Sequence, residues 1–502
     1  MLILAATGGV DHPAIDWHGL APELVLLGLL TVLLLVDAIG GERSRWAMPS
    51  LTGIGLLAAL IPVATLAYDG NVRSMFDGAY VVDNYALLFK ALFLVAGYVV
   101  VLLSTNYIAE GDYWESEYYQ LLVASLLGML VMASARDLVS VFVALELLSI
   151  PAYMLAAWRK RDLGSEEAGM KYYLMGVFAS ALLLYGMSLL YGMAGSTRLV
   201  DIAAAIEGTT VPALVTVAIV LVVVGFAFKI SAVPFHAWAP DTYEGAPTPV
   251  TAFLAVASKA AGFVALMTVV LIAFPTQPEV FEPLIWVLAA VTMIVGNLIA
   301  LRQTNLVRML AYSGVAQAGY ILAPLAVAGF AGGSGTQAVE AVSTYLVIYA
   351  AMNLGAFAVV IAVARKTGSA EISSYGGLFS YSPVLAVCMT IFLFSLAGIP
   401  PLAGWYGKLA VFLALVQPGS ASGYVLAVIV GVTSVIALFY YARVARVMWV
   451  DPVPDGDATP VRVPVSLRAA LVITVVATVV IGVLPQLLGR ITGAESFLSL
   501  GG

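Results

Sequence analysis

The sequence has 502 residues and is strongly apolar: 62% of the residues are hydrophobic, 10% are charged, and the mean hydropathy is +1.02. Soluble globular domains do not have this composition, whereas polytopic helical membrane proteins do. The formal net charge of −7 at pH 7 argues against nucleic-acid binding.

The small number of cysteines and histidines excludes several kinds of redox centre. The chain has one cysteine, Cys388, and three histidines. An iron–sulfur cluster needs several cysteines, and a c-type haem needs a Cys-x-x-Cys-His motif. Only His236 falls at membrane depth, so a haem held between two histidines is excluded as well. We therefore expect this chain to hold no cofactor and no metal ion, and to carry no electrons itself.

Apolar segments separated by polar breaks predict an all-α membrane protein with about 14 transmembrane helices. All 502 residues are expected to form a single membrane domain. The centres of the segments lie near residues 29, 58, 96, 125, 147, 180, 222, 260, 291, 315, 351, 398, 437 and 476.

The seventh and twelfth segments contain prolines, at Pro234 and at Pro400 and Pro401. Proline removes a backbone donor and clashes with the preceding turn, so both helices are predicted to break there. The two breaks are five spans apart, which indicates two inverted five-helix repeats, the usual build of secondary transporters. The expected parts are a three-helix segment at 20–110, repeat 1 at 117–274, repeat 2 at 281–450 and a last span at 465–488.

The positive charges in the loops are distributed unequally between the two sides of the predicted bundle. One side has 13 of them and the other has four, Arg73, Arg136, Arg198 and Arg490; the remaining five of the 22 Lys and Arg lie in spans. The positive-inside rule places the richer side in the cytoplasm and both termini outside. The 13 are Arg43, Arg45, Arg159, Lys160, Arg161, Arg302, Arg308, Arg365, Lys366, Arg443, Arg446, Arg462 and Arg468.

Five of the seven lysines lie inside predicted spans, at positions 90, 171, 229, 259 and 408. A lysine in hydrocarbon costs at least ~2.5–3.5 kcal/mol, so such residues usually face a bundle interior or a water-filled path. They often relay protons or ions. The chain is therefore predicted to move charge through a membrane.

Glu146 lies in the middle of the fifth span, and Lys229 lies one turn before the break at Pro234. We expect them to pair, because each would otherwise be an uncompensated buried charge. Alternatively, the pair of Glu146 and Lys229 has only a structural role and holds two helices together. Lys259 has no acidic partner at helical spacing, and Lys408 follows the second break; both are candidates for a proton relay.

Three further groups have a structural explanation beside the functional one. His236 follows Pro234 and could bridge protons, or it could only hydrogen-bond the broken backbone. Lys171 follows Glu166 and Glu167 near the end of its span, where snorkelling to the membrane surface competes with a supporting role. For Lys90, near the outer end of the third span, snorkelling is the preferred interpretation.

Three motifs resemble those of the antiporter-like proton-channel subunits of respiratory complex I, the bacterial NADH:quinone oxidoreductase. They are the run from Phe228 to Val250 (FKISAVPFHAWAPDTYEGAPTPV), the run LAGIPPLAG ending at Gly404, and LELLS around Glu146. The resemblance covers nearly the whole chain. Among the three related subunits the chain is most similar to subunit N, because lysine rather than glutamate occupies position 408.

This resemblance implies a function, partners and a location. Glu146 and Lys229 would couple to neighbouring subunits, Lys259 would be the central relay and Lys408 the exit-side lysine. The subunit would move protons from the cytoplasm to the outside of a bacterial inner (plasma) membrane. NAD, FMN, iron–sulfur clusters and quinone are expected in partner subunits, and the neighbours in the membrane would be antiporter-like and small membrane subunits.

Other functions remain open from the sequence. A subunit of a multi-subunit Na⁺/H⁺ exchanger shares the broken-helix motifs, but sodium needs oxygen ligands and this membrane core offers mostly lysines. A subunit of a membrane-bound hydrogenase shares the fold. A third possibility is a structural spacer that moves no ions. The buried lysines argue against it, because leucine at these positions would cost less in a spacer.

Overall fold

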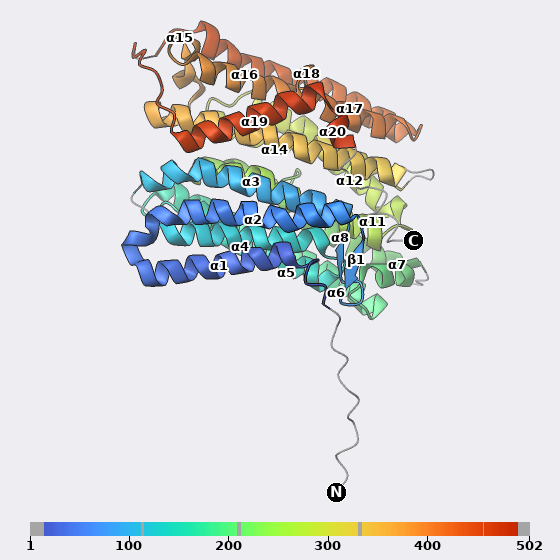
Figure 1. Ribbon diagram of the computed structural model, residues 1–502. Coiled ribbons are helices and arrows are strands. Elements are labelled where there is room, and N and C mark those ends of the chain that lie inside the picture. The colour runs from blue at the N-terminus through green and yellow to red at the C-terminus, as the bar shows by residue number, and fades with distance from the viewer. Residues whose placement is uncertain (1–14, 112–114, 208–211, 330–333, 455, 490–502) are drawn as a thin grey trace.

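The computed structural model describes residues 15–111, 115–207, 212–329, 334–454 and 456–489, and these are almost entirely helical. Helices run roughly parallel along the long direction of the molecule in Figure 1. The expected all-α membrane fold is confirmed. The helices of the first half are α1 (Ala21–Gly40), α2 (Met48–Asp69), α3 (Asn84–Ala109), α4 (Glu115–Ser134), α5 (Leu138–Ala156), α6 (Leu163–Ala194), α7 (Leu199–Glu207), α8 (Pro212–Lys229), α9 (Trp238–Gly245), α10 (Thr248–Phe253) and α11 (Lys259–Ala273).

The second half continues the same architecture. Its helices are α12 (Pro278–Ala300), α13 (Leu306–Leu322), α14 (Ser334–Thr367), α15 (Leu378–Tyr381), α16 (Pro383–Ala397), α17 (Ala403–Val416), α18 (Ala421–Val450), α19 (Val465–Val483) and α20 (Gln486–Gly489). Shorter segments are the 3₁₀ turns η1 (Gly41–Ala47), η3 (Ala323–Val327) and η4 (Ile372–Tyr375), the π-helical turn η2 (Leu254–Ser258), and the antiparallel hairpin β1 (Arg73–Met75) and β2 (Tyr80–Val82).

Within the described residues, thirteen helical segments are long and apolar enough to cross a membrane, and α16 and α17 form a shorter apolar pair. If α16 and α17 are counted together as one interrupted span, these segments correspond to the fourteen expected from the sequence. Several helices begin at a polar residue that caps free backbone amides. Asp83 caps α3, Asp137 caps α5 and Asn305 caps α13.

Helix α8 ends at Lys229 and α9 begins at Trp238, with Pro234 between them. Side chains satisfy some of the freed backbone groups. The amide of Val233 donates to Thr292 Oγ1 at 2.9 Å, and the indole of Trp238 donates to the Phe228 carbonyl at 3.0 Å. The backbone of the first interruption is therefore fixed by a side chain of α12 and by a side chain next to the interruption itself.

Helix α16 ends at Ala397 and α17 begins at Ala403, so Pro400 and Pro401 lie in this second interruption. Gly398 follows the last helical residue with φ +91°, a left-handed conformation that favours glycine. The amide of Gly404 donates to Ser395 Oγ at 3.0 Å. Both interruptions place helix ends inside the bundle.

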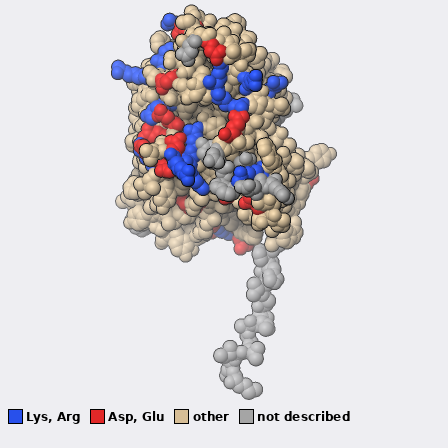
Figure 2. Space-filling model, turned by 90° about the vertical axis from the view of Figure 1, so that its left-hand side faces the viewer, with Lys and Arg blue, Asp and Glu red and all other residues tan. Residues whose placement is uncertain are grey.

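One end of the bundle carries many charged side chains (Figure 2). η1 and α15 lie at one end of the molecule and β1 and α7 at the other (Figure 1). Figure 2 shows the end with η1 and α15, where Lys and Arg are mixed with Asp and Glu on a face rimmed by uncharged residues. We call it the arginine-rich end, because the loop segments with Arg45, Arg159 and Lys366 belong to it by chain order.

Candidate proton-relay site

Lys229, at the end of α8, is buried with 4% of its surface exposed. Its Nζ donates to Ser149 Oγ of α5 at 2.8 Å and to the Tyr172 hydroxyl of α6 at 3.2 Å. A Cβ atom at Gly262 of α11 would lie 3.0 Å from Lys229 Cγ. Because Gly262 has no side chain, α11 can pack directly on the Lys229 stem.

Glu146 does not contact Lys229 in the way that the sequence led us to expect. The described residues contain no ion pair between them. Glu146 is half-buried and accepts a hydrogen bond from Ser180 Oγ of α6 at 2.5 Å. Ser149, three residues later on the same helix, takes the place of the carboxylate at Lys229. The physical reason is direction: Glu146 turns toward α6, and a hydroxyl one turn along α5 lies closer to α8.

Lys259 opens α11 directly after the π-helical turn η2 and is 1% exposed. Its Nζ donates to the Gly314 carbonyl of α13 at 2.7 Å. A Cβ atom at Gly314 would lie 3.0 Å from the Tyr349 hydroxyl and 3.3 Å from Lys259 Nζ, so glycine leaves room for both groups.

Lys408, on α17, is 9% exposed and reaches back to the end of α16. Its Nζ donates to the Ala397 carbonyl at 2.9 Å and lies 4.7 Å from the ring centroid of Tyr320. The carbonyl is available because the interruption at Gly398 removes its helical partner. The aromatic face contributes a cation–π attraction whenever the lysine is charged.

A chain of buried polar side chains joins the surroundings of Lys259 and Lys408. Gln317 of α13 donates to the Leu396 carbonyl at 3.1 Å and to the Tyr441 hydroxyl at 3.4 Å, and it accepts from the Tyr345 hydroxyl at 2.5 Å. Tyr441 also hydrogen-bonds Ser313. Ser313 precedes Gly314, the acceptor of Lys259, and Leu396 precedes Ala397, the acceptor of Lys408. We call Ser313, Gln317, Tyr345 and Tyr441 the polar bridge.

The polar bridge was not predicted from the sequence, although the sequence of α13 contains two of its four residues at a helical spacing. Ser313 and Gln317 are four residues apart in α13, so they share one face of this helix. Both are 1% exposed. A buried glutamine needs partners for its amide, which makes it informative in a membrane helix. The tyrosines on α14 and α18 could not be assigned to it from spacing.

Lys90 is not a snorkelling residue, and that expectation was wrong. Its side chain has 0% exposure and Nζ lies 2.8 Å from Glu23 Oε1 of α1. It also donates to the Tyr80 hydroxyl at 2.9 Å. Nearby, Arg136 pairs with Asp83 at 3.0 Å, again with both side chains buried. These buried pairs tie α1, α3 and β2 together at the end opposite the arginine-rich end.

Lys171 lies in a network of ion pairs that is partly exposed. Its Nζ is 2.6 Å from Glu167 and 2.7 Å from Asp241 of α9, and its side chain is 43% exposed. Arg308 of α13 binds the same Asp241 at 2.9 Å and Glu244 at 2.6 Å. α9 is thus held from both sides, by α6 and by α13.

His236 lies in the first interruption and is half-buried. Its ring centroid is 6.3 Å from that of Tyr312. Among the residues that the structure describes, no three His, Cys, Asp or Glu side chains gather in a way that could hold a metal ion.

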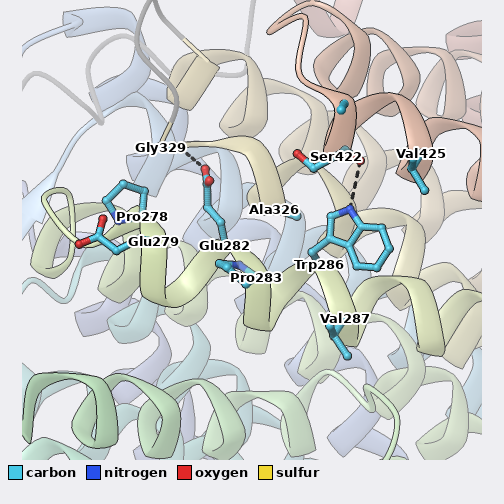
Figure 3. A pocket seen from close by; sticks show the side chains of 11 residues that line it. Pro278, Glu279, Glu282, Pro283, Trp286, Val287, Ala326, Gly329, Ser422 and Val425 are labelled. Atoms are coloured by element: carbon cyan, nitrogen blue, oxygen red, sulfur yellow. Dashed lines mark hydrogen bonds between the residues drawn. The ribbon is translucent and has the colours of Figure 1, made fainter. Parts of the chain in front are cut away.

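One cavity is lined by none of the buried lysines. It has a volume of about 850 Å³ and is lined by the start of α12, the end of η3 and the start of α18. Two polar side chains in its lining form hydrogen bonds within the protein (Figure 3). Glu282 accepts from the Gly329 amide at 2.7 Å, and Trp286 donates to the Ser422 carbonyl at 3.1 Å. None of the residues that line this cavity is a lysine.

A helical membrane protein with two interrupted helices and buried lysines near both of them belongs to the class of ion-translocating membrane subunits. Comparison with known proteins identifies the family. Residues 135–437 match the family described as NADH:quinone oxidoreductase/Mrp antiporter, TM, and the chain belongs to this family.

Individual relatives agree over nearly the full length. NADH-quinone oxidoreductase subunit N of Desulfitobacterium hafniense is 42% identical over 498 residues, 95% of this chain and 98% of that protein. A chain of respiratory complex I from Thermus thermophilus with bound aureothin is 32% identical, with a TM-score of 0.76 over 94% of this chain and 99% of that one. A chain of the Mrp complex from a Dietzia species has a TM-score of 0.84 at 22% identity, over 97% and 98%; this likeness concerns the fold alone.

Proposed function

We propose that this chain is a proton-translocating membrane subunit of an NADH:quinone oxidoreductase, with Glu146, Lys229, Lys259 and Lys408 as its relay. The observation that carries the proposal is the bonding of the three lysines. Each Nζ binds neutral hydroxyl or carbonyl oxygens. Both an amine and an ammonium can donate to such oxygens, so these contacts leave the lysine free to gain or lose a proton.

The proposed path runs along the buried groups in order. A proton near Glu146 passes by Ser149 to Lys229 and then by Tyr172 toward Lys259. The polar bridge leads from Lys259 toward Lys408. Hydroxyl groups both donate and accept hydrogen bonds, which a proton-conducting chain needs, and water at the interruptions would complete it. Lys171 and His236 have supporting roles at the first interruption.

The proposed orientation places the arginine-rich end in the cytoplasm and both termini outside, in a bacterial inner membrane. The bias of 13 loop cations against four supports it. Protons would leave at the end opposite the arginine-rich end. Repeats at 117–274 and 281–450, each with one interrupted helix, are proposed as the two halves of the relay. The two termini themselves lie outside the described residues.

Electron transfer is assigned to partner subunits with NAD, FMN, iron–sulfur clusters and quinone. The names of the relatives, NADH-quinone oxidoreductase subunit N and respiratory complex I, support this assembly. A cation/proton exchanger subunit is the second candidate, because the Mrp complex shares the fold. The identity of 42% to a subunit N and the neutral ligands of the three lysines favour the first candidate.

Lys259 provides the test. Arginine keeps the charge but does not deprotonate under ordinary conditions, whereas methionine removes the charge. We expect Lys259→Arg to impair proton uptake by the reconstituted complex nearly as much as Lys259→Met, measured against NADH oxidation. If Lys259→Arg pumps like wild type and Lys259→Met fails, Lys259 supplies only a positive field and does not carry protons. A sodium dependence of transport would favour the exchanger instead.

A further inference from the structure

A second cavity of about 660 Å³ lies between α16 and α19 near the arginine-rich end. On α19 its lining residues recur on one helical face, and on α16 they occupy the first two turns. We call this cavity the α16–α19 groove. Its side chains are apolar except at the end near the polypeptide loop, where Arg468 lies. The lining includes Val384, Leu385 and Cys388 of α16 and Leu471, Val472, Val475 and Val476 of α19.

The end wall of the groove is fixed by hydrogen bonds. The loop before α19 supplies Pro460, Val461 and Val463 to the lining. The Val461 amide donates to Ser382 Oγ at 2.9 Å. Lys366 Nζ donates to the carbonyls of Asp457 and Thr459 at 2.8 and 2.6 Å. The loop is therefore held against the start of α16, and the groove has a defined closed end.

Arg468 is exposed in the first turn of α19. Among the residues that the structure describes, its guanidinium has neither an ion-pair partner nor a side-chain hydrogen bond. Val472 and Val476 are 57% and 53% exposed along the groove below it. Val476 is eight positions after Arg468, which is about 12 Å along a helix and close to the depth of one leaflet of the hydrocarbon core.

We propose that the α16–α19 groove binds one anionic glycerophospholipid, with its phosphate on Arg468 and an acyl chain along the valines. Charge complementarity selects this occupant. A free guanidinium at the edge of an apolar groove matches a phosphate joined to a hydrocarbon chain, and basic pockets between helices on the cytoplasmic side are typical sites for such headgroups. A helix from a neighbouring subunit would have to supply a carboxylate at the same place.

The native cysteine gives a direct readout, because Cys388 is the only cysteine of the chain and lines the groove. The intact complex is delipidated and then supplied with phosphatidylglycerol, phosphatidylcholine or inorganic phosphate. Labelling of Cys388 by N-ethylmaleimide is followed by peptide mass spectrometry. We expect phosphatidylglycerol to slow labelling at concentrations where phosphatidylcholine has a small effect and phosphate has none.

Variants separate the site from general charge effects. Arg468→Gln should weaken phosphatidylglycerol protection about fivefold, which is the contribution of one basic residue near an anionic surface. Arg468→Lys should keep most of it. The control is Arg302→Gln, an exposed arginine at the same end that does not line the groove; it should leave protection unchanged.

Three outcomes would overturn the proposal. One is equal protection by both phospholipids, which would mean an unselective acyl-chain contact. Another is unchanged protection in Arg468→Gln. The third is a Cys388 that stays unreactive in the delipidated complex of every variant, which would mean that a protein segment covers the groove. NADH oxidation by each variant reports that the complex is assembled.

Discussion

Gln317 connects four helices through one amide. It lies on α13, and its partners are the Tyr345 hydroxyl of α14, the Leu396 carbonyl of α16 and the Tyr441 hydroxyl of α18. All these groups are buried, so water cannot replace a lost partner readily. The amide itself does not titrate. Its role in the proposed relay is to hold hydroxyls and carbonyls at fixed positions between Lys259 and Lys408.

Gln317→Leu should therefore lower the number of protons moved per NADH oxidised severalfold, while electron transfer persists. The change leaves buried polar groups unpaired, at about 1–3 kcal/mol for each. Proton uptake and NADH oxidation by the reconstituted complex measure the ratio. Gln303→Leu is the matched control, because that side chain binds only a carbonyl of its own helix end, Ile299. If both variants move the same number of protons per NADH oxidised, Gln317 has no role in the relay.

Among the buried lysines of the described residues, Lys90 differs from the relay lysines because it has a carboxylate partner, Glu23. Lys90→Met should lower the yield of assembled complex, since breaking a buried pair typically costs about 3–5 kcal/mol. Replacing both partners, Lys90→Met with Glu23→Gln, should restore much of the yield. Thermal stability of the purified complex measures both effects. If Lys90→Met assembles normally and only pumping falls, Lys90 belongs to the relay instead.

At the scale of elements, α9 is the short helix between the first interruption and α10. Asp241 joins α9 to two other helices, because it binds Lys171 of α6 and Arg308 of α13 at once. Its side chain is 35% exposed, so each of these ion pairs is worth only about 0–1 kcal/mol. These ion pairs therefore add only a small contribution to the packing of the buried Trp238 and Tyr243 in α9.

Asp241→Asn should loosen α9 without unfolding the bundle. Hydrogen exchange of the intact complex should increase in residues 238–245 and stay unchanged in α10, because the lost ion pairs attach α9 to α6 and α13 and do not involve α10. Asp457→Asn is the control, since Asp457 pairs with Lys366 on an exposed loop far along the chain. If exchange in α9 does not change, Pro240 and the buried Trp238 suffice to hold it.

The sequence could predict those features that are determined by residues close together in the chain. Apolar length located the spans, and Pro234 and Pro400 lie between helices, after α8 and after α16. That each proline breaks a single span stays a prediction. Contacts between distant segments could not be predicted. Ser313 and Tyr441 are 128 residues apart, and nothing in one helix specifies which neighbour supplies its hydroxyl. The Glu146–Lys229 contact was expected from charge alone, but side-chain direction on α5 decided in favour of Ser149.

At the scale of the whole molecule, the polar groups of the proposed relay extend from α5 to α17. Glu146 is at one limit of this path, between α5 and α6. It is half-buried, with the exposed apolar residues Val143 and Ile150 on the same helix. A half-exposed carboxylate at the middle of a span is costly in lipid, so a neighbouring subunit is expected to cover it. Glu146 would then be where the relay of this chain begins.

Glu146→Ala tests that assignment for the complete complex. We expect proton pumping to fall strongly and NADH oxidation to fall less, because the change removes a relay group and leaves the redox partners intact. Quinone reduction and proton uptake, measured in the same vesicles, give the ratio. Glu166→Ala is the control, a glutamate near the start of α6 that accepts a hydrogen bond from the exposed Arg161 backbone. Normal pumping by assembled Glu146→Ala would show that protons enter the chain elsewhere and that Glu146 only bonds α5 to α6 through Ser180.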